Sequence, residues 1–555
     1  MDPKSSKPPA TSPCPPAAPP APPADRALGV AEWVAAIALT ALIAAAHLLL
    51  LANIGPLWRD EIQILNLANM PTLADLWHYN EHEAFPIFWH MVLRAWTALG
   101  PGQADFGLRV LGCIVGLGIV GLTWWSGRRA GCGVPLVALV LAGLSPTVLR
   151  YGDSIRGYGF GTFWMLLMLG VVARMARDPT RRNIVVAGAA AILAVQSMYM
   201  NAAVLLGLGL ASCLAGLVCR RWRPAVALII IGVIAAVTLL PYLDPILRQS
   251  RWNDFVRFPV SAGAVFWKFA EAADAAGRGM AWVWVALAAL ALGACAWGAL
   301  RRSPKENRYM AVFAGAALVF AIACYAAFLL IGRVPLKAWY YVAGMALAAV
   351  LLEAALGPLV RAGRAARIVR IAAAILLAAM AAGPVWHDAH VRMTNVDRIA
   401  AQLQNVAERN DLIVVMPWWP GVTFTRYYRG EAPWTTLPDL GPLPIQRYDL
   451  FRKKMQEPEP IRPVLERMAA TLASGGRVWL VGCPRFLQPG EVPIVVPPPP
   501  RGPWSEGPYI ESWSLQMGYF LQRRARSISV VPVRDEGEPV SPFEHVPLLV
   551  AEGWR

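Results

Sequence analysis

Two adjacent carboxylates, Asp60 and Glu61, come shortly after the first long apolar run of the chain, Leu28 to Ile54. Charged side chains are costly inside a lipid bilayer and far less costly just outside it, so this order places both acids at a membrane surface. A carboxylate positioned there is able to take a proton from a bound hydroxyl, which is the chemistry of a general base. The same pair also suits two simpler interpretations, a helix cap for Asp60 and a solvated surface charge for Glu61.

Other polar residues gather in the same way, each group at the end of an apolar run. If a helix bundle brings these ends together, carboxylates and cations face each other above an apolar wall and form one polar site. The groups are Asn80, Glu81, His82 and Glu83; Arg150, Tyr151, Asp153, Ser154, Arg156 and Tyr158; Gln196, Tyr199 and Asn201; and Lys337 with Trp339, Tyr340 and Tyr341.

The composition identifies the kind of protein that must position these residues. Hydrophobic residues make up 57% of the chain and charged residues only 15%, and the mean hydropathy is +0.45, which is typical of a polytopic membrane protein. The net charge of +16 comes with arginine-rich loops between apolar runs, so membrane topology explains it better than nucleic-acid binding. The eight cysteines lack the spacing of a disulfide scaffold or a zinc site.

Runs of about 20 apolar residues, enough to cross a ~30 Å hydrocarbon core, predict about eleven transmembrane helices. Residues 1–27, rich in Pro, Ala and Ser, are expected to form a disordered tail ahead of them. The predicted spans lie near 28–54, 109–127, 132–149, 157–175, 184–199, 202–219, 224–242, 280–300, 309–331, 338–357 and 368–386.

The distribution of arginine and lysine predicts the orientation. If residues 84–100 lie in the interface without crossing, all five basic loops fall on the side of the N-terminus, as the positive-inside rule requires. The N-terminus is then cytoplasmic, Asp60 and Glu61 face outward, and the setting is the inner membrane of a cell. The basic loops contain Arg128 and Arg129; Arg174, Arg177, Arg181 and Arg182; Arg220, Arg221 and Arg223; Arg301, Arg302, Lys305 and Arg308; and Arg361, Arg364 and Arg367.

Residues 387–555 differ from the apolar part. Short apolar runs bounded by turn residues, Asp411–Met416 and Arg477–Gly482, predict strands, and Val396–Arg409 predicts a helix. The chain is therefore expected to consist of the tail, a transmembrane domain (28–386) and an extracytoplasmic α/β domain (387–555). The charged outer segment 243–279 is interpreted either as a lid over the site or as a surface loop.

The order of these elements resembles the GT-C superfamily of integral-membrane glycosyltransferases, in particular its protein O-mannosyltransferase and aminoarabinose transferase branch. The outward acidic pair after the first helix is the first point of likeness. The segments Glu83–Trp89, Phe106–Arg109 and Ser145–Tyr158 look like that branch's His-Pro-Pro-Leu-Tyr-Tyr, Phe-Ala-Leu-Arg and Ser-Pro…Arg-Tyr…Glu-Ala-Arg-Met-Tyr regions. The likeness covers roughly residues 28–386 and rests on the joint order of its motifs.

This resemblance implies a GT-C-like fold and transfer of a sugar from a polyprenyl-phosphate carrier to a protein, lipid or glycan acceptor at the outer face. It assigns Asp60 as the general base of an inverting displacement, with Glu61 either orienting it or standing beside it as a solvated neighbour. A phosphate leaving group needs cations rather than a second acid. Arg156 is the first choice for that role, followed by Arg150 and Lys337, and interfacial snorkelling is the alternative for all three.

The remaining polar and aromatic residues are assigned to the acceptor or the sugar. Asp153 pairs with Arg156 or joins Asp60 in holding a divalent cation, so no cofactor is certain, a metal is possible, and its ligands are unknown. For the tyrosines, an aromatic belt at the interface is an equal explanation. The residues assigned to acceptor or sugar are Glu83, His82, Asp153, Tyr151, Tyr158 and Tyr340.

Two other classes of protein fit the sequence less well. A transporter or lipid-carrier flippase is expected to show broken helices and charges in the middle of the membrane, whereas the charges noted above gather at the ends of the spans. A structural or assembly protein that presents the C-terminal domain leaves these clustered charges without a role.

Overall fold

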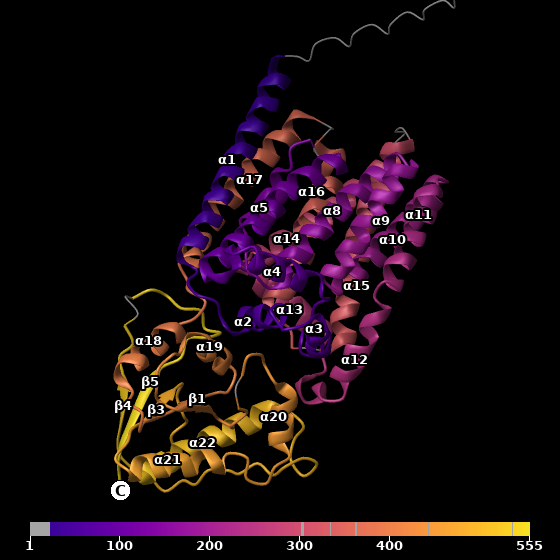
Figure 1. Ribbon diagram of the computed structural model, residues 1–555. Helices are drawn as coiled ribbons and strands as arrows, with labels where there is room; N and C mark the ends of the chain where they lie inside the picture. Colours follow the sequence, from indigo (N-terminus) through magenta and orange to yellow (C-terminus); the bar gives the residue numbers. More distant parts are fainter. Residues whose placement is uncertain are drawn as a thin grey trace, which may run out of the picture.

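The computed structural model describes residues 23–131, 133–300, 305–333, 335–360, 363–441, 443–534 and 537–555. Most of the predicted disordered tail, residues 1–22, lies outside the described residues. Its last residues do not, because α1 (Pro23–Asn53) already begins at Pro23. A bundle of long helices forms one part of the molecule, and a mixed helix and sheet domain forms the other (Figure 1).

In the described part of the chain, nine helices are long and apolar enough to cross a membrane. Each coincides with a predicted span, because the apolar runs are long enough for a continuous helix whose backbone satisfies its own hydrogen bonds in lipid. Besides α1 they are α5 (Asp105–Ala130), α8 (Gly157–Arg177), α10 (Met200–Cys219), α11 (Arg223–Val237) with its continuation through η4 (Leu240–Tyr242) and α12 (Leu243–Ser250), α14 (Met280–Leu300), α15 (Lys305–Gly332), α16 (Val342–Val360) and α17 (Arg364–Ala389).

Two predicted spans have a different form. The span near 184–199 is the 17-residue helix α9 (Arg181–Ser197). The span near 132–149 is broken into α6 (Leu136–Ala138), the π-helical turn η3 (Leu139–Gly143) and α7 (Pro146–Gly152). Pro135 and Pro146 lack an N–H donor and flank the break. The backbone N–H groups of Val137 and Ala138 instead donate to the buried carboxylate of Glu353 on α16, at 2.5 and 3.1 Å.

Short elements surround the ends of the long helices near the C-terminal domain. The segment predicted to lie in the interface contains α4 (Phe88–Ala98), whose 11 residues are too few to cross the bilayer. The segment 243–279 is not a simple surface loop, since Phe255 is fully buried and packs on Tyr448 and Phe451. The short elements are α2 (Arg59–Ala68), α3 (Leu73–Tyr79), η1 (Asn80–His82), η2 (Pro101–Gln103), η5 (Asn253–Val256), α13 (Ala262–Asp274) and η6 (Ala338–Tyr341).

The C-terminal domain is α/β, as predicted. Its sheet has the order β2-β1-β3-β5-β4, in which β1, β2 and β3 run parallel and β5 is antiparallel to both β3 and β4. Both faces of β1 and β3 are buried, which explains their unbroken apolar sequences. The elements are α18 (Val396–Val406), β1 (Leu412–Val415), α19 (Pro420–Tyr427), β2 (Trp434–Thr436), α20 (Tyr448–Met455), α21 (Arg462–Ala473), β3 (Val478–Val481), α22 (Glu506–Arg524), β4 (Ala525–Val531) and β5 (Leu548–Trp554).

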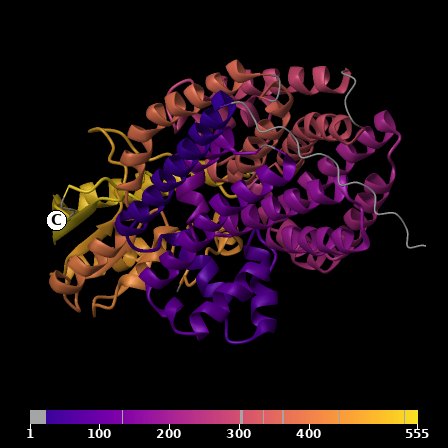
Figure 2. The ribbon, with the colours of Figure 1, turned by 90° about the horizontal axis from the view of Figure 1, so that it is seen from above.

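The two parts of the molecule are joined at one end of the bundle. Asp105 at the start of α5 forms an ion pair with Arg426 of α19 and accepts a hydrogen bond from Tyr427, and Arg452 of α20 pairs with Asp254 at 2.9 Å. Helices α1 and α17 lie side by side in both views, and α1 begins at the opposite end of the bundle (Figures 1 and 2). The start of α1 and the C-terminal domain therefore lie at opposite ends of the helical bundle.

Candidate active site

Asp60 lies at the junction of the two domains, at the second position of α2. The residue that precedes this helix as its N-cap is Trp58, so the interpretation of Asp60 as an N-cap is wrong. About 21% of the Asp60 side chain is exposed. Its Oδ1 accepts a hydrogen bond of 2.8 Å from the side-chain amide of Gln446, and the guanidinium of Arg59 lies 3.6 Å away. In the described ranges, no hydrogen bond reaches Oδ2.

Glu61 has a different environment although it is the next residue. Its side chain is fully buried, and its Oε1 lies 2.5 Å from Arg109 Nη1. Ser154 Oγ donates to the same oxygen at 2.9 Å, and the Ile155 N–H donates at 3.3 Å. The interpretation of Glu61 as a solvated neighbour is therefore wrong, because a buried carboxylate must be paired in this way. Glu61 fixes the start of α2, and with it the backbone of Asp60.

Arg156 lies directly beside Asp60. Its Nη1 donates both to the Asp60 carbonyl oxygen at 3.1 Å and to Glu83 Oε2 at 3.0 Å, and its guanidinium lies over the Phe85 ring. Burial raises the pKa of Glu83, an effect that the charge of Arg156 opposes. The Nε of Arg156 is buried and has no hydrogen-bond partner in the part of the chain that the structure describes. Arg156 thus retains a donor for another anion.

Lys337 is the second cation near Asp60. Its ammonium lies 5.8 Å from the ring centroid of Trp339 and 5.7 Å from that of Phe543. Among the described residues, no carboxylate lies within 4.0 Å of it. Burial lowers the pKa of Lys337, and the charge of Arg59 lowers it further, whereas Asp60 opposes this effect. A partly desolvated cation without a paired acid is a favourable place for an anionic ligand.

Aromatic rings surround this polar cluster. Tyr158 packs on Phe85 with ring centroids 4.9 Å apart and on Tyr340 at 6.0 Å, and Tyr151 packs on Trp339 at 5.2 Å. Tyr151 and Tyr158 are buried. They therefore pack inside the protein instead of forming part of a lipid-facing aromatic belt.

Arg150, a predicted phosphate ligand, has other partners. Its Nε donates to both carboxylate oxygens of Asp388 on α17, at 3.1 and 3.0 Å. Its other nitrogens donate to the backbone carbonyls of Asp388 and Val391. A guanidinium whose three nitrogens are bound in this way connects α7 to the end of α17, so the structure contradicts its assignment as a phosphate ligand.

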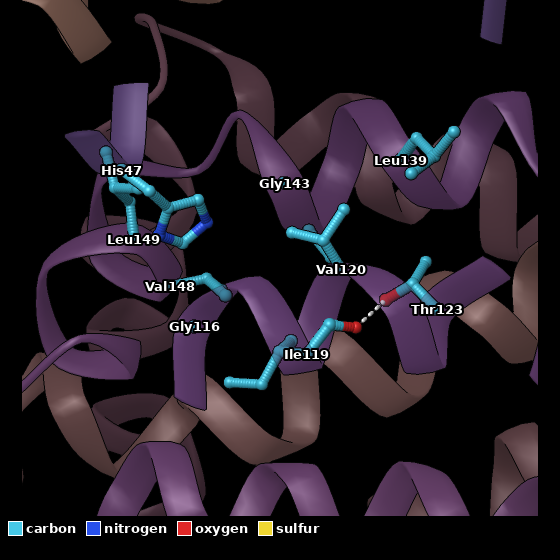
Figure 3. Close-up of a pocket in the computed structure, with 10 residues that line it drawn as sticks. His47, Gly116, Ile119, Val120, Thr123, Leu139, Gly143, Val148 and Leu149 are labelled. Atoms are coloured by element: carbon cyan, nitrogen blue, oxygen red, sulfur yellow. Dashed lines mark hydrogen bonds between the residues drawn. The ribbon is translucent and has the colours of Figure 1, made fainter. Parts of the chain in front are cut away.

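Asp153 pairs with neither Arg156 nor Asp60. Both its carboxylate oxygens lie 2.8 Å from Nδ1 of His47, a residue of α1. The His47 ring borders a small cavity whose other lining residues include Ile119, Val120, Leu139 and Val148 (Figure 3). The predicted pair between Asp153 and Arg156 is therefore wrong, because the buried Asp153 carboxylate faces α1 and α5 instead.

His82 contacts other residues than Asp60: its ring stacks on Trp252, and its Nε2 lies 4.0 Å from Asp449. Burial lowers the pKa of His82 to about 4. In the described part of the chain, no three His, Cys, Asp or Glu side chains gather as metal ligands. Asp153 pairs with His47 and Glu83 pairs with Arg156, so neither carboxylate gathers with Asp60 as a metal ligand in the described structure.

Sequence reasoning missed the contribution of the C-terminal domain to this site. Gln446 contacts Asp60 across a sequence separation of 386 residues. Glu544 lies 3.7 Å from Arg59 Nη1, and Arg59 Nη1 also donates to the Phe543 carbonyl at 2.7 Å. Burial raises the pKa of Glu544 to about 7, although the Arg59 charge acts in the opposite direction. No local sequence pattern marks Gln446 or Glu544, so only the folded chain reveals them.

No protein-family model matches the chain, and no curated protein sequence matches it. Its structure is similar to that of ArnT from Cupriavidus metallidurans, solved bound to undecaprenyl phosphate and in the apo state. The TM-scores are 0.44 and 0.46, the identity is 15%, and the match covers 81% of this chain and 92 and 93% of those chains. It is also similar to the oligosaccharyltransferase AglB from Archaeoglobus fulgidus, solved with an inhibitory peptide and a dolichol-phosphate. There the TM-score is 0.43, the identity 10%, and the coverage 80% of this chain and 69% of that one.

Proposed function

We propose that this protein is a membrane glycosyltransferase that moves a sugar from a polyprenyl-phosphate donor to an acceptor hydroxyl, with Asp60 as the general base. The observation that carries this proposal is the arrangement of one hydrogen-bond donor and two cations around the Asp60 carboxylate. Asp60 Oδ1 is held by Gln446, its other oxygen is open in the described structure, and two cations with unused capacity, Arg156 and Lys337, lie beside it.

The reaction is a single displacement at the anomeric carbon. Asp60 Oδ2 takes the proton of the acceptor hydroxyl, the hydroxyl oxygen forms the new glycosidic bond, and the bond to the donor phosphate breaks on the opposite side of the sugar ring. This sequence inverts the anomeric configuration. The departing phosphate takes the bonding electron pair and does not need a proton if cations stabilise its charge.

Lys337 and Arg156 supply those cations, and Arg156 offers to the phosphate its Nε, which is unpaired in the described structure. Both are partly or fully removed from water, where a charge contact with phosphate is stronger than at an exposed site. Glu83 orients Arg156 through its second carboxylate oxygen. Tyr158 and Tyr340 lie beside this pair and offer ring faces and hydroxyls to the sugar or the acceptor.

The C-terminal domain covers the base and takes part in acceptor binding. Gln446 fixes the Asp60 carboxylate from this domain, and Glu506 faces Lys337 and Arg59 from the start of α22. Glu506 also lines a cavity of about 400 Å³ together with Trp419 and Arg485. This cavity gives the acceptor, whether protein, lipid or glycan, an approach from the aqueous side.

The position of basic residues at one end of the bundle supports the orientation predicted from the basic loops. Arg128 and Arg364 lie at the end of the bundle where α1 begins, and Arg364 pairs there with Asp25. We therefore infer that this end is cytoplasmic and that residues 387–555 and Asp60 lie outside an inner membrane. Digestion of intact spheroplasts tests this topology, since external protease must cleave a tag placed after Arg555, and protection of that tag would reverse the orientation.

The experiment that tests the activity uses membranes supplied with a polyprenyl-phosphate sugar that carries a radiolabel. Asp60→Asn is expected to lower the initial rate of transfer by about 10²–10⁴-fold while the protein stays folded. Asp75→Asn is the matched control, because Asp75 is a partly exposed carboxylate whose hydrogen bonds belong to the capping box of α3 with Thr72. Transfer by Asp60→Asn at the rate of the control would disprove the assignment of the base.

The alternative of a lipid-carrier flippase gains one observation, the broken segment between α5 and α8. A flippase moves the donor across the membrane without breaking the bond between sugar and phosphate. Release of free polyprenyl phosphate, in an amount equal to the glycosylated acceptor, therefore separates the two functions. Movement of intact donor without release of polyprenyl phosphate would favour the flippase.

A further inference from the structure

A second polar cavity lies at the end of the bundle opposite Asp60. Its volume is about 980 Å³, which makes it large enough for a lipid headgroup. It is formed by the start of α1, the end of α5, the end of α16 and the start of α17. Its charged and aromatic lining residues are Asp25, Glu32, Trp33, Arg128, Arg364, Arg367 and Arg370.

The cavity has an excess of positive charge, because four arginines line it against two carboxylates. Arg364 pairs with Asp25 at 2.6 Å, and Arg367 and Arg370 both pair with Glu32 at 2.6 Å. Arg128 lies over the ring of Trp33 at 5.5 Å, and no carboxylate of the described residues lies within 4.0 Å of it. The guanidinium of Arg128 is therefore available to an anion in the cavity.

Arg370 provides an independent sign of a missing partner. It is only 8% exposed, its Nη1 donates to Glu353 at 3.0 Å, and its Nη2 donates to Glu32 at 2.6 Å. Its Nε is buried and has no hydrogen-bond partner in the described structure. An unpaired buried N–H is unfavourable, and a polar atom bound in the cavity would satisfy it.

The outer surface of α1 next to the cavity is apolar. Val30, Val34 and Ile37 lie on α1 on either side of Trp33, with 62, 61 and 59% of their surface exposed, as expected for side chains that face lipid. A molecule with its charged group among the arginines has a continuous apolar surface for an acyl chain beside it. Basic pockets between transmembrane helices are suited to anionic headgroups in this way.

We propose that this cavity binds a phosphate-type anion, carried either by the headgroup of an anionic membrane lipid or by free phosphate. Arg128 and Arg364 contact the anion at the mouth, because planar guanidinium groups bind phosphate oxygens in pairs. Arg370 Nε contacts a polar atom deeper in the cavity. The site is separate from the Asp60 cluster and does not depend on the proposed transfer reaction.

The test measures lipid binding to the full-length, delipidated protein in detergent by native mass spectrometry. Dioleoylphosphatidylglycerol is the anionic probe and dioleoylphosphatidylcholine the zwitterionic one. Arg128→Gln is expected to weaken binding of the anionic lipid about five-fold, and the double variant Arg128→Gln/Arg364→Gln about 25-fold, from roughly 1 kcal/mol per arginine. The Arg364 side chain is 54% exposed and Arg128 is also exposed, so the variants are expected to fold.

Arg129→Gln is the matched control. Arg129 is the next residue of α5, is also exposed and also lies over a tryptophan, Trp125, but it does not line the cavity. Anionic lipid must bind this control as tightly as wild type. Equal losses for Arg128→Gln and Arg129→Gln, or equal binding of both lipids to wild type, would overturn the proposal.

A third arm identifies the source of the anion. Inorganic phosphate at millimolar concentration is added to the complex with phosphatidylglycerol. Displacement of the lipid that depends on Arg128 supports free phosphate as a ligand, and retention of the lipid supports the headgroup with its chains. Failure of both phosphatidylglycerol and phosphate to bind in an Arg128-dependent manner would disprove the site.

Discussion

The two ends of the membrane domain hold charged groups in different ways. At the end where α1 begins, Glu32, Arg370 and Glu353 pair with one another inside the bundle, and Glu353 also accepts two backbone N–H groups. At the other end, Asp60 and Lys337 lie close together but are only partly paired. Buried carboxylates that are paired in this way, such as Glu353, mainly hold helices together, whereas donors and acceptors with unused capacity are suited to a ligand. The comparison therefore separates residues that hold the helices together from residues proposed to take part in the reaction.

The largest expected effect is on stability, at the end remote from Asp60. Arg370→Met leaves Glu32 and Glu353 buried without this cation and is expected to lower the free energy of unfolding by about 3–5 kcal/mol. Sugar transfer per folded molecule should stay close to that of wild type. Thermal unfolding in detergent measures the first quantity and the labelled-donor assay the second. If Arg370→Met is as stable as wild type, the paired charges at this end do not stabilise the fold, and the difference between the two ends is contradicted.

Lys337→Met is expected to give the opposite result. If Lys337 stabilises the departing phosphate as proposed, its loss should lower the rate of transfer by about 10²–10³-fold. Little change in stability is expected, because no carboxylate of the described residues lies within 4.0 Å of Lys337. Lys268→Met is the control, since Lys268 lies nearby but pairs with the exposed Glu271. Initial rates and melting temperatures are measured for both variants. Equal rates of transfer would exclude Lys337 from the site.

The buried carboxyl group of Glu544 predicts that the stability of the protein depends on pH. Burial raises its pKa to about 7 in the folded chain, against the opposing charge of Arg59 and the hydroxyl contacts of Thr423 and Thr394. The folded state therefore binds this proton more tightly than the unfolded state. Its stabilising contribution is fully present below about pH 4.5 and is lost as the pH rises through about 7, a change on the order of 1–3 kcal/mol.

Glu544→Gln removes this titration. The difference in melting temperature between pH 5 and pH 7.5 should be smaller in the variant than in wild type. If both proteins lose the same stability over this interval, another group is responsible for it.

The smallest effect is expected at the contact between the C-terminal domain and the base. Gln446→Ala removes the hydrogen bond to Asp60 Oδ1, and a hydrogen bond to a charged group contributes about 1.5–3 kcal/mol. Part of this loss is recovered by water, because Asp60 is partly exposed, so we expect a fall in transfer of about ten-fold. Gln402→Ala, which removes an amide of the same domain that donates to the Pro532 carbonyl, should leave the rate unchanged. An unchanged rate in Gln446→Ala would show that the domain does not hold the base.

The sequence identified much of this arrangement in advance. The apolar runs predicted all the long helices, and short apolar runs bounded by turn residues predicted β1 and β3, because both patterns depend on local composition. The structure also brings Asp60, Arg156 and Lys337 near one another, since each lies at the end of a span on the same side. The partners of Arg150 and Asp153 were not predictable in this way. Asp388 and His47 are distant in sequence, and a charge at the end of a helix has several possible partners until the helices are packed.

Sequence by itself therefore determined that this chain crosses a membrane many times, which ends of its helices lie on the same side, and that carboxylates and cations collect there. The reason is that the cost of placing charge in lipid acts on each residue separately. Only the tertiary structure decided that Glu61 is paired while Asp60 is partly open, that Gln446 reaches Asp60, and that a second charged cavity lies at the other end. These properties depend on which side chains meet across the packed helices and domains, and such pairings are set by the geometry of the whole fold.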